Sequence, residues 1–197
     1  MNAASSRMIE LEKTHLVKPP SIGSSPGLQL FEELILPHLN AAYNLARWLT
    51  RNDDDARDIV QEAYLRAFRF FANYRGGDGK SWLLEIVRNT CYSFQQREKR
   101  SVKNVVFDEA VHAPSASPLD AEEALVTAGK HAIMRKCIED LPETFREILI
   151  MRELEEMSYR QIADVAGLAT GTVMSRLSRA RKRLEECAKA RSMESGK

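Results

Sequence analysis

The chain has 197 residues, of which 44% are hydrophobic and 29% are charged, with 29 basic and 28 acidic side chains. This length allows one or two domains with packed cores, and the composition is that of a globular protein. The charges are segregated: basic residues gather at 97–103 and 176–191, and acidic residues gather at 53–62 and 139–156. No apolar run approaches the roughly 20 residues of a membrane span, and the N-terminus lacks the pattern of a signal peptide. We therefore expect a cytoplasmic protein without membrane insertion.

The first part of the chain is predicted to be an extension followed by three helices. Residues 1–27 carry Ser, Pro and Gly without periodicity and are expected to form a mobile extension. Two helical segments follow, with Pro37 at the start of the second. A third helix is expected to be capped by Asp53 to Asp55, to keep one apolar stripe, and to present an acidic face at Asp58 and Glu62.

A glycine-rich break, NYRGGDGKSW at 73–82, separates the third helix from a fourth, whose apolar residues repeat at helical spacing up to a basic end. We therefore expect a first helical domain over residues 28–100. Periodicity then fades and Pro and Ser appear, which indicates a flexible linker over residues 101–129. A second helical domain is predicted over residues 130–187, followed by a tail at 188–197.

The second domain is predicted to end in a helix-turn-helix. Ser158 and Gln161 form the capping-box pattern that starts the first helix of this motif. Gly167 can adopt the positive φ needed to leave that helix, and Thr170 can cap the next one. Another helix, which starts at Pro142, precedes the pair. Two short helices joined by a glycine turn, the second strongly basic, are typical of a motif that reads DNA.

The basic helix of this motif has two distinct faces. Its apolar residues share one face at helical spacing and are Val173, Leu177, Ala180, Leu184 and Cys187. The polar face, suited to phosphates and base edges, carries Thr172, Ser175, Arg176, Arg179, Lys182 and Arg183. A solvated helix interleaves charges of both signs, whereas the basic residues of this helix stand together before its first acid, Glu185. This clustering favours DNA binding.

The cysteines and histidines predict neither a metal site nor a catalytic site. Cys91, Cys137 and Cys187 are odd in number, widely spaced and outside any CxxC pattern. Buried reduced thiols are the favoured interpretation, and a redox-sensing pair stays open. The four histidines are scattered, with no acid or nucleophile placed beside one in a recognisable motif. We expect no cofactor and no enzymatic activity.

The predicted fold class is all-α. No segment alternates apolar and polar residues as a half-buried strand would, and each periodic segment repeats at helical spacing. We expect two small helical domains joined by a flexible linker, the C-terminal one containing the helix-turn-helix. Trp82 stands at the start of an apolar helix, where packing is the favoured role.

Two long segments of the chain resemble a known family. LPETFREILIMRELEEMSYRQIADVAGLATGTVMSRLSRARKRL resembles the C-terminal domain of bacterial sigma factors of the extracytoplasmic function (ECF) group, within the sigma-70 family. DDARDIVQEAYLRAFRFFANYRGG followed by SWLLEIVRNTCY resembles their N-terminal core domain. The resemblance implies a protein that binds core RNA polymerase, directs it to promoters of a stress or envelope response, and promotes DNA opening. It also implies an anti-sigma factor as a partner.

The same resemblance implies three contact sites. The acidic helix would dock on core RNA polymerase through Asp58, Gln61 and Glu62. The next loop and helix would bind the minus-ten promoter element through Arg75, Gly76, Gly77, Asp78, Lys80, Arg88, Asn89, Tyr92 and Arg97. The basic helix would bind the minus-thirty-five element through Thr172, Ser175, Arg176, Ser178, Arg179 and Lys182. Met174 stands where the family commonly has a basic residue, so the preferred DNA sequence is expected to differ.

Two other functions compete with this interpretation. A dimeric helix-turn-helix regulator that binds an operator explains residues 158–184 equally well, but it leaves DIVQEAYLRAF unexplained. An enzyme is suggested by GGDGKS, which superficially resembles a phosphate-binding loop. That motif fails because Tyr74 stands where a phosphate loop needs a glycine, and because a helix rather than a strand leads into it.

Overall fold

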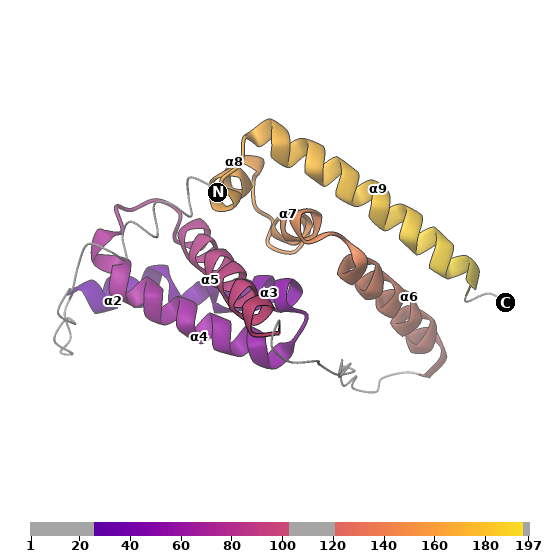
Figure 1. The fold of residues 1–197 in the computed structure, drawn as a ribbon, viewed down its shortest axis with the longest axis horizontal. Coiled ribbons are helices and arrows are strands. Elements are labelled where there is room, and N and C mark those ends of the chain that lie inside the picture. The colour runs from indigo at the N-terminus through magenta and orange to yellow at the C-terminus, as the bar shows by residue number, and fades with distance from the viewer. Residues whose placement is uncertain (1–25, 103–120, 195–197) are drawn as a thin grey trace.

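The structure, a computed structural model, describes residues 26–102 and 121–194. Within these two ranges it contains helices and turns and no strand, which confirms the predicted all-α fold class. The first range forms an N-terminal domain and the second a C-terminal domain (Figure 1). Most of the predicted N-terminal extension, and residues 103–120 of the predicted linker, lie outside the described residues.

The described part of the N-terminal domain contains α2 (Pro26–Leu34), η1 (Leu36–His38), α3 (Leu39–Thr50), α4 (Asp53–Phe70), η2 (Phe71–Asn73) and α5 (Gly79–Val102). Pro37 lies in η1, so α3 begins later than predicted. The cap of α4 is Asn52, whose side chain accepts from the backbone N–H groups of Asp54 (2.8 Å) and Asp55 (3.2 Å). The prediction that the aspartates cap this helix is wrong. They occupy its first turn, where their charge favours the positive end of the helix dipole.

Apolar side chains bury α3, α4 and α5 against one another. Leu45, Ile59 and Leu84 are each at most 1% exposed, and the buried side of α4 is the predicted apolar stripe. The ring of Trp82 lies 6.2 Å from that of Phe71, centroid to centroid, and packs against the core. Trp82 therefore packs against the core, as predicted. This core holds the start of α5 and the end of α4 together, and the glycine loop between them projects outward.

The described part of the C-terminal domain contains α6 (Ala121–Asp140), α7 (Glu143–Glu153), α8 (Tyr159–Ala166) and α9 (Thr170–Glu194). α6 begins inside the predicted linker, and α9 continues into the predicted tail. α6 and α9 lie side by side (Figure 1). The predicted second domain ended at residue 187, where the apolar stripe of α9 ends. A helix continues beyond such a point through alanine and charged residues of high helix propensity.

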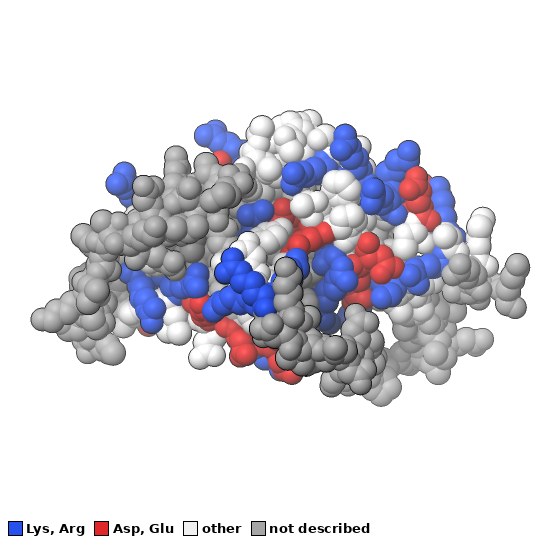
Figure 2. All heavy atoms as spheres, in the orientation of Figure 1, with Lys and Arg blue, Asp and Glu red and all other residues white. Residues whose placement is uncertain are grey.

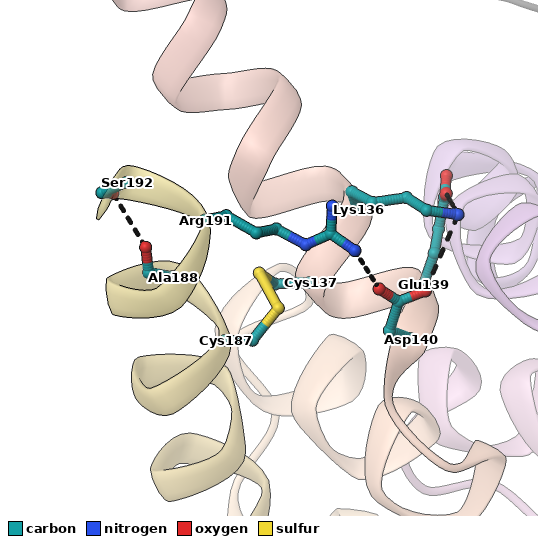
Figure 3. Close-up of a disulfide and its surroundings, with 8 residues drawn as sticks. All are labelled: Lys136, Cys137, Glu139, Asp140, Cys187, Ala188, Arg191 and Ser192. Atoms are coloured by element: carbon teal, nitrogen blue, oxygen red, sulfur yellow. Dashed lines mark hydrogen bonds and ion pairs between the residues drawn. A yellow bond between two sulfur atoms is a disulfide. The ribbon is translucent and has the colours of Figure 1, made fainter. Parts of the chain in front are cut away.

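A disulfide joins α6 to α9. Cys137 and Cys187 are bonded, with 5.7 Å between their Cα atoms (Figure 3). Arg191 on α9 pairs with Asp140 on α6 beside the bond, at 2.7 Å. The favoured interpretation of these two cysteines as reduced thiols is therefore wrong, because a sequence separation of 50 residues hides their proximity. Cys91 keeps the expected state, a free buried thiol, and burial raises its pKa to about 12.

The two domains pack against each other. α7 and α8 lie against α3 and α5 of the N-terminal domain (Figure 1). Arg146 on α7 is 2% exposed, and its guanidinium donates to the carbonyl oxygen of Trp48 on α3 at 3.0 Å. It also donates to the carbonyl oxygens of Ile138, Glu139 and Leu141. Arg146 therefore satisfies its buried donors while it joins the C-terminal domain to α3.

Candidate nucleic-acid and polymerase interfaces

The helix-turn-helix has the local features that its sequence predicts. Ser158 Oγ accepts from the backbone N–H of Gln161 (3.2 Å), and Gln161 Oε1 accepts from the backbone N–H of Ser158 (2.8 Å). Gly167 ends α8 with φ +65°, a left-handed conformation that favours glycine. The prediction that Thr170 caps the next helix is wrong, because α9 begins at Thr170 and the carbonyl oxygen of Ala169 accepts from the backbone N–H groups of Thr172 and Val173. The start and end of α8 are therefore both set by local contacts.

Replacing Ser158 by alanine is expected to lower the free energy of unfolding by about 1 kcal/mol, because a helix N-terminus then loses an acceptor. Urea denaturation followed by circular dichroism measures this change. Ser178→Ala, at an exposed site inside α9, is the matched control and should change stability by less than about 0.5 kcal/mol. A loss at Ser158 no larger than the control's would contradict the capping role.

The apolar face of α9 is buried as predicted. Val173, Leu177 and Ala180 are each at most 1% exposed. Leu184 is half-buried, and Cys187 forms the disulfide with α6. These contacts fix the rotation of α9 about its own axis, so the opposite face points to solvent.

The outward face of α9 carries the residues predicted to bind the minus-thirty-five element. The exposed or half-buried members are Thr172, Ser175, Arg176, Ser178, Arg179 and Lys182. Figure 2 shows Lys and Arg side chains gathered along this helix. Two neighbouring cations contact α7 instead: Arg181 pairs with Glu153 at 2.7 Å, and Arg183 lies over the ring of Phe145 at 5.2 Å. Arg183 thus contacts protein, although the sequence placed it on the outward face.

The glycine loop between η2 and α5 is exposed. Gly76 and Gly77 have φ +82° and +105°, and a Cβ at either position would meet no atom within 4 Å. The backbone conformation, rather than a shortage of space, therefore requires glycine at both positions. The Tyr74 hydroxyl donates to the carbonyl oxygen of Gly77 at 2.7 Å and holds the loop. Arg75, between them, is exposed to solvent.

Arg88 and Tyr92 on α5 contact the C-terminal domain. Arg88 Nε and Nη2 donate to the two carboxylate oxygens of Glu147 on α7, at 2.7 and 3.3 Å. The Tyr92 hydroxyl donates to the same carboxylate at 2.9 Å, and Glu147 is fully buried. Burial lowers the pKa of Arg88, but the hydrogen bond and charge of Glu147 outweigh burial, so the net shift is upward. Asn89, next along the chain, is half-buried.

Lys80 and Asp78, at the start of α5, also contact the C-terminal domain. Lys80 Nζ lies 2.9 Å from the carboxylate of Glu155 and donates to its backbone carbonyl oxygen at 2.7 Å. Asn44 on α3 donates to the same carboxylate at 3.0 Å. Asp78 accepts from Gln161 Nε2 at 2.6 Å. Burial raises the pKa of Asp78, but the hydrogen bonds that its carboxylate accepts outweigh burial and hold the pKa below its usual value.

The acidic face of α4 carries the residues predicted to bind polymerase. Asp58 and Gln61 are exposed, and Glu62 is half-buried. Glu62 pairs with Arg66 on the next turn, and Arg97 on α5 lies 3.5 Å from its other oxygen. Burial raises the pKa of Glu62, but the hydrogen bond from Arg66 and the nearby cations outweigh it and lower the pKa. Arg97, predicted to bind the minus-ten element, therefore lies beside the acidic face.

The described residues include neither a candidate metal site nor a candidate membrane span. Among them, no group of three or more His, Cys, Asp or Glu side chains could hold a metal ion. None of the helices in this described part of the chain is long and apolar enough to cross a membrane. The candidate interfaces consist of exposed charged and polar side chains on α4, α5 and α9.

Comparison with known proteins decides the family. The sigma-70 region 2 family model matches residues 34–101, and the sigma-70 region 4 model matches residues 131–184. The RNA polymerase sigma-H factor of Pseudomonas aeruginosa is 31% identical over 166 residues, which cover 79% of this chain and 84% of that protein. The ECF RNA polymerase sigma factor SigE of Mycolicibacterium smegmatis is 29% identical over 83% of this chain and 63% of that protein. The ECF RNA polymerase sigma-E factor of Haemophilus influenzae is 31% identical over 152 residues, which cover 72% of this chain and 77% of that protein. The chain belongs to the ECF sigma factors.

A solved structure agrees with this membership. The sigma factor RpoE of Bartonella quintana, in complex with the anti-sigma factor NepR, is 31% identical with a TM-score of 0.67. The match covers 82% of this ECF sigma factor and 98% of that chain. Sigma factors are transcription initiation factors, so the family confirms the prediction that the protein is not an enzyme.

Sequence reasoning missed the residues that join the two domains of this ECF sigma factor. Arg146, Glu147 and Glu155 were assigned no role. One signal was available, because Arg146 and Glu147 interrupt the apolar helix FREILIM, and charges at inward positions require partners. The pattern does not identify those partners, because they are distant in sequence: Arg88 lies 59 residues before Glu147.

Proposed function

We propose that this ECF sigma factor binds core RNA polymerase through α4 and directs it to promoters by contacting two DNA elements. In this proposal α9 reads the minus-thirty-five element in the major groove. The glycine loop and α5 contact the minus-ten element and promote DNA opening. The observation that carries the proposal is an exposed acidic face on α4 and an exposed basic face on α9 in one chain. A stand-alone dimeric regulator needs only the basic face.

The chemistry of α9 suits the major groove. A guanidinium presents parallel donors that match the acceptor edge of guanine, and Arg176 and Arg179 lie on the outward face. Ser175 and Lys182 suit phosphate oxygens. Met174, 53% exposed on the same helix, offers an apolar contact where the family commonly has a cation.

Replacing Arg179 by alanine is expected to reduce promoter-directed initiation with core polymerase by roughly 5- to 150-fold, because a lost base contact costs about 1 to 3 kcal/mol. Run-off transcription on a promoter fragment measures the change. Lys189→Ala is the matched control, since Lys189 is an exposed cation further along α9 that pairs with Glu185. Equal activity of the two variants would contradict base reading by Arg179.

Reversing the charge of Asp58 by Asp58→Lys is expected to weaken binding to core RNA polymerase by about tenfold, because like charges then meet at a basic partner surface. Affinity for purified core enzyme, measured by fluorescence anisotropy of the labelled protein, tests this. Glu33→Lys, at an exposed acid on α2, is the control for the change in net charge. If both variants lose affinity equally, the α4 face does not carry the contact.

Cellular location, regulon and regulation belong to the same proposal. The protein acts in the cytoplasm on promoters of a stress or envelope response, and an anti-sigma factor holds it inactive. The similar RpoE of B. quintana, solved with its anti-sigma factor NepR, supports the last point. A pull-down from cells should recover a small inhibitory protein with the sigma factor. Repeated recovery of polymerase without such a protein would count against the anti-sigma partner.

A further inference from the structure

The Cys137–Cys187 disulfide is the main attachment of α6 to α9. Cys137 is the one buried residue among those of α6 whose side chains the structure describes, 129–140. The side chains of Arg191 and Asp140, which pair beside the bond, are 37% and 43% exposed (Figure 3). An exposed ion pair contributes little to stability. Most of α6 therefore depends on the covalent bond for its place against α9.

The C-terminal end of α6 is held separately by α7. Arg146 donates to the carbonyl oxygens of Ile138 at 3.2 Å and Glu139 at 3.1 Å. Both acceptors follow Cys137 in the chain, so these hydrogen bonds do not depend on the disulfide. The first part of α6 is therefore free to move about this end once the disulfide opens.

The first half of α9 has anchors of its own. Val173 and Leu177 are each at most 1% exposed and lie well before Cys187 in the helix. They hold the part of α9 that carries the proposed DNA contacts. Opening of the disulfide therefore affects α6 and the end of α9, and it leaves the first half of α9 in place.

A cavity gives a small molecule access to the bond. Its volume is about 380 Å³, and both cysteines line it. Pockets that bind small molecules have volumes of about 300 to 1,000 Å³. Cys187 is half-buried, whereas Cys137 is 1% exposed. A reagent that enters the cavity therefore reaches the sulfur of Cys187 rather than that of Cys137.

The charges around the cavity favour a zwitterion. Arg183 lines it with a cation, and Glu186 and Asp140 line it with anions. A peptide thiol carries carboxylate and ammonium groups, which can pair with side chains of both signs. A thiol that carries charge of one sign only meets repulsion from some of these side chains.

We propose that Cys187 is a thiol–disulfide exchange site for a small peptide thiol, and that the exchange releases α6 from α9. The exchange needs neither polymerase nor DNA, and so goes beyond the proposed function. The proposed cytoplasmic location agrees with it, because disulfides in that compartment are usually transient and redox-sensing.

The exchange takes two balanced steps. A thiolate of the peptide attacks Sγ of Cys187, the bond between the two protein sulfurs breaks, and Cys137 leaves as a thiolate. A second peptide thiolate attacks the peptide sulfur of this mixed disulfide, and Cys187 leaves as a thiolate. The protein thiolates take up the protons that the two peptide thiols lost. Two peptide thiols are thus oxidised to one peptide disulfide, which can reverse both steps, and the protein disulfide is reduced.

Trapping of the mixed disulfide tests which sulfur is attacked. The oxidised full-length protein is mixed with millimolar glutathione, quenched with N-ethylmaleimide and mapped by mass spectrometry. Glutathione on Cys187 with maleimide on Cys137 should exceed the reverse assignment by about tenfold, because only one sulfur is accessible. Cys91 is the internal control, since a buried free thiol should carry neither group while the core stays folded.

Glutathione mainly on Cys137, or equally on both cysteines, would overturn the proposal. So would the absence of any mixed disulfide under conditions in which dithiothreitol reduces the bond. Neither measurement involves polymerase or DNA, so such a failure leaves the proposed function untouched.

A distance measurement tests the release of α6. Reductant-resistant spin labels, attached through unnatural amino acids at His131 on α6 and Ala190 on α9, report the separation of the two helices; both sites are exposed. Reduction of wild type should lengthen this distance by roughly 5 Å or more, because His131 lies about 9 Å along the helix from Cys137. Labels at Arg160 on α8 and Arg179 on α9, both exposed, form the control pair, whose distance should stay the same.

The double variant Cys137→Ser/Cys187→Ser should show the longer distance with and without reductant. If this variant does not fold, wild type with and without reductant carries the test alone. An unchanged distance between α6 and α9 after reduction would overturn the release of α6. Equal lengthening of the control pair would show that the bond stabilises the whole domain, and would overturn the proposal as well.

Discussion

Replacing Arg146 by alanine is expected to lower the free energy of unfolding by about 4 kcal/mol. The guanidinium donates to carbonyl oxygens near the C-terminal ends of two helices, among them Trp48 of α3 and Glu139 of α6. Such carbonyls have no partner within their own helix. Each acceptor left unpaired in a buried site costs about 1 to 3 kcal/mol, and water that enters the vacated space reduces the sum. The wild-type side chain stays charged at neutral pH, since burial lowers its pKa only to about 10.

Urea denaturation monitored by tryptophan fluorescence, from Trp48 and Trp82, measures the effect of Arg146→Ala. Arg160→Ala is the control, because Arg160 is an exposed arginine on α8. The control should change the free energy of unfolding by less than about 0.5 kcal/mol. A loss of about 1 kcal/mol or less for Arg146→Ala would show that water replaces the guanidinium readily, and that Arg146 does not join the domains.

Removing the Cys137–Cys187 disulfide is expected to lower the free energy of unfolding by about 3 kcal/mol. The bond closes a loop across a sequence separation of 50 residues, and a cross-link over that span restricts the unfolded chain strongly. It also holds the last turns of α9 against α6, where Arg191 and Asp140 add an exposed ion pair. Such an exposed pair contributes little without the covalent bond.

The test compares wild type with Cys137→Ser/Cys187→Ser, each unfolded in urea and refolded with and without dithiothreitol. The reductant should destabilise wild type to the level of the double variant and leave the double variant unchanged. If wild type has the same stability with and without the reductant, and matches the double variant, the bond does not form in solution.

Local sequence signals predicted the helix-turn-helix correctly. The contacts that define it lie within a few residues of each other, as between Ser158 and Gln161, and the positive φ of Gly167 follows from its own missing side chain. The buried side of α9 was also predicted, because Val173, Leu177 and Ala180 share one face. Where a structural feature depends on residues that are close in sequence, the residue pattern is sufficient to predict it.

Long-range contacts were not predictable in the same way. Glu147 meets Arg88, and Cys137 meets Cys187, across separations that no periodic pattern spans. The sequence placed Arg88 on a DNA-binding helix. It does not show that the guanidinium of Arg88 is paired with a carboxylate of the same chain. The polar end of α9 was missed for another reason: the apolar stripe ends at Cys187, whereas alanine and charged residues of high helix propensity continue the helix.

Run-off transcription with purified core RNA polymerase, on a library of promoter fragments with and without this protein, tests the sigma-factor role most directly. The proposed function predicts initiation that depends on the protein and occurs at a shared pair of spaced DNA elements. Failure to stimulate initiation, together with tight binding to a palindrome in the absence of polymerase, would contradict it and identify a dimeric regulator instead.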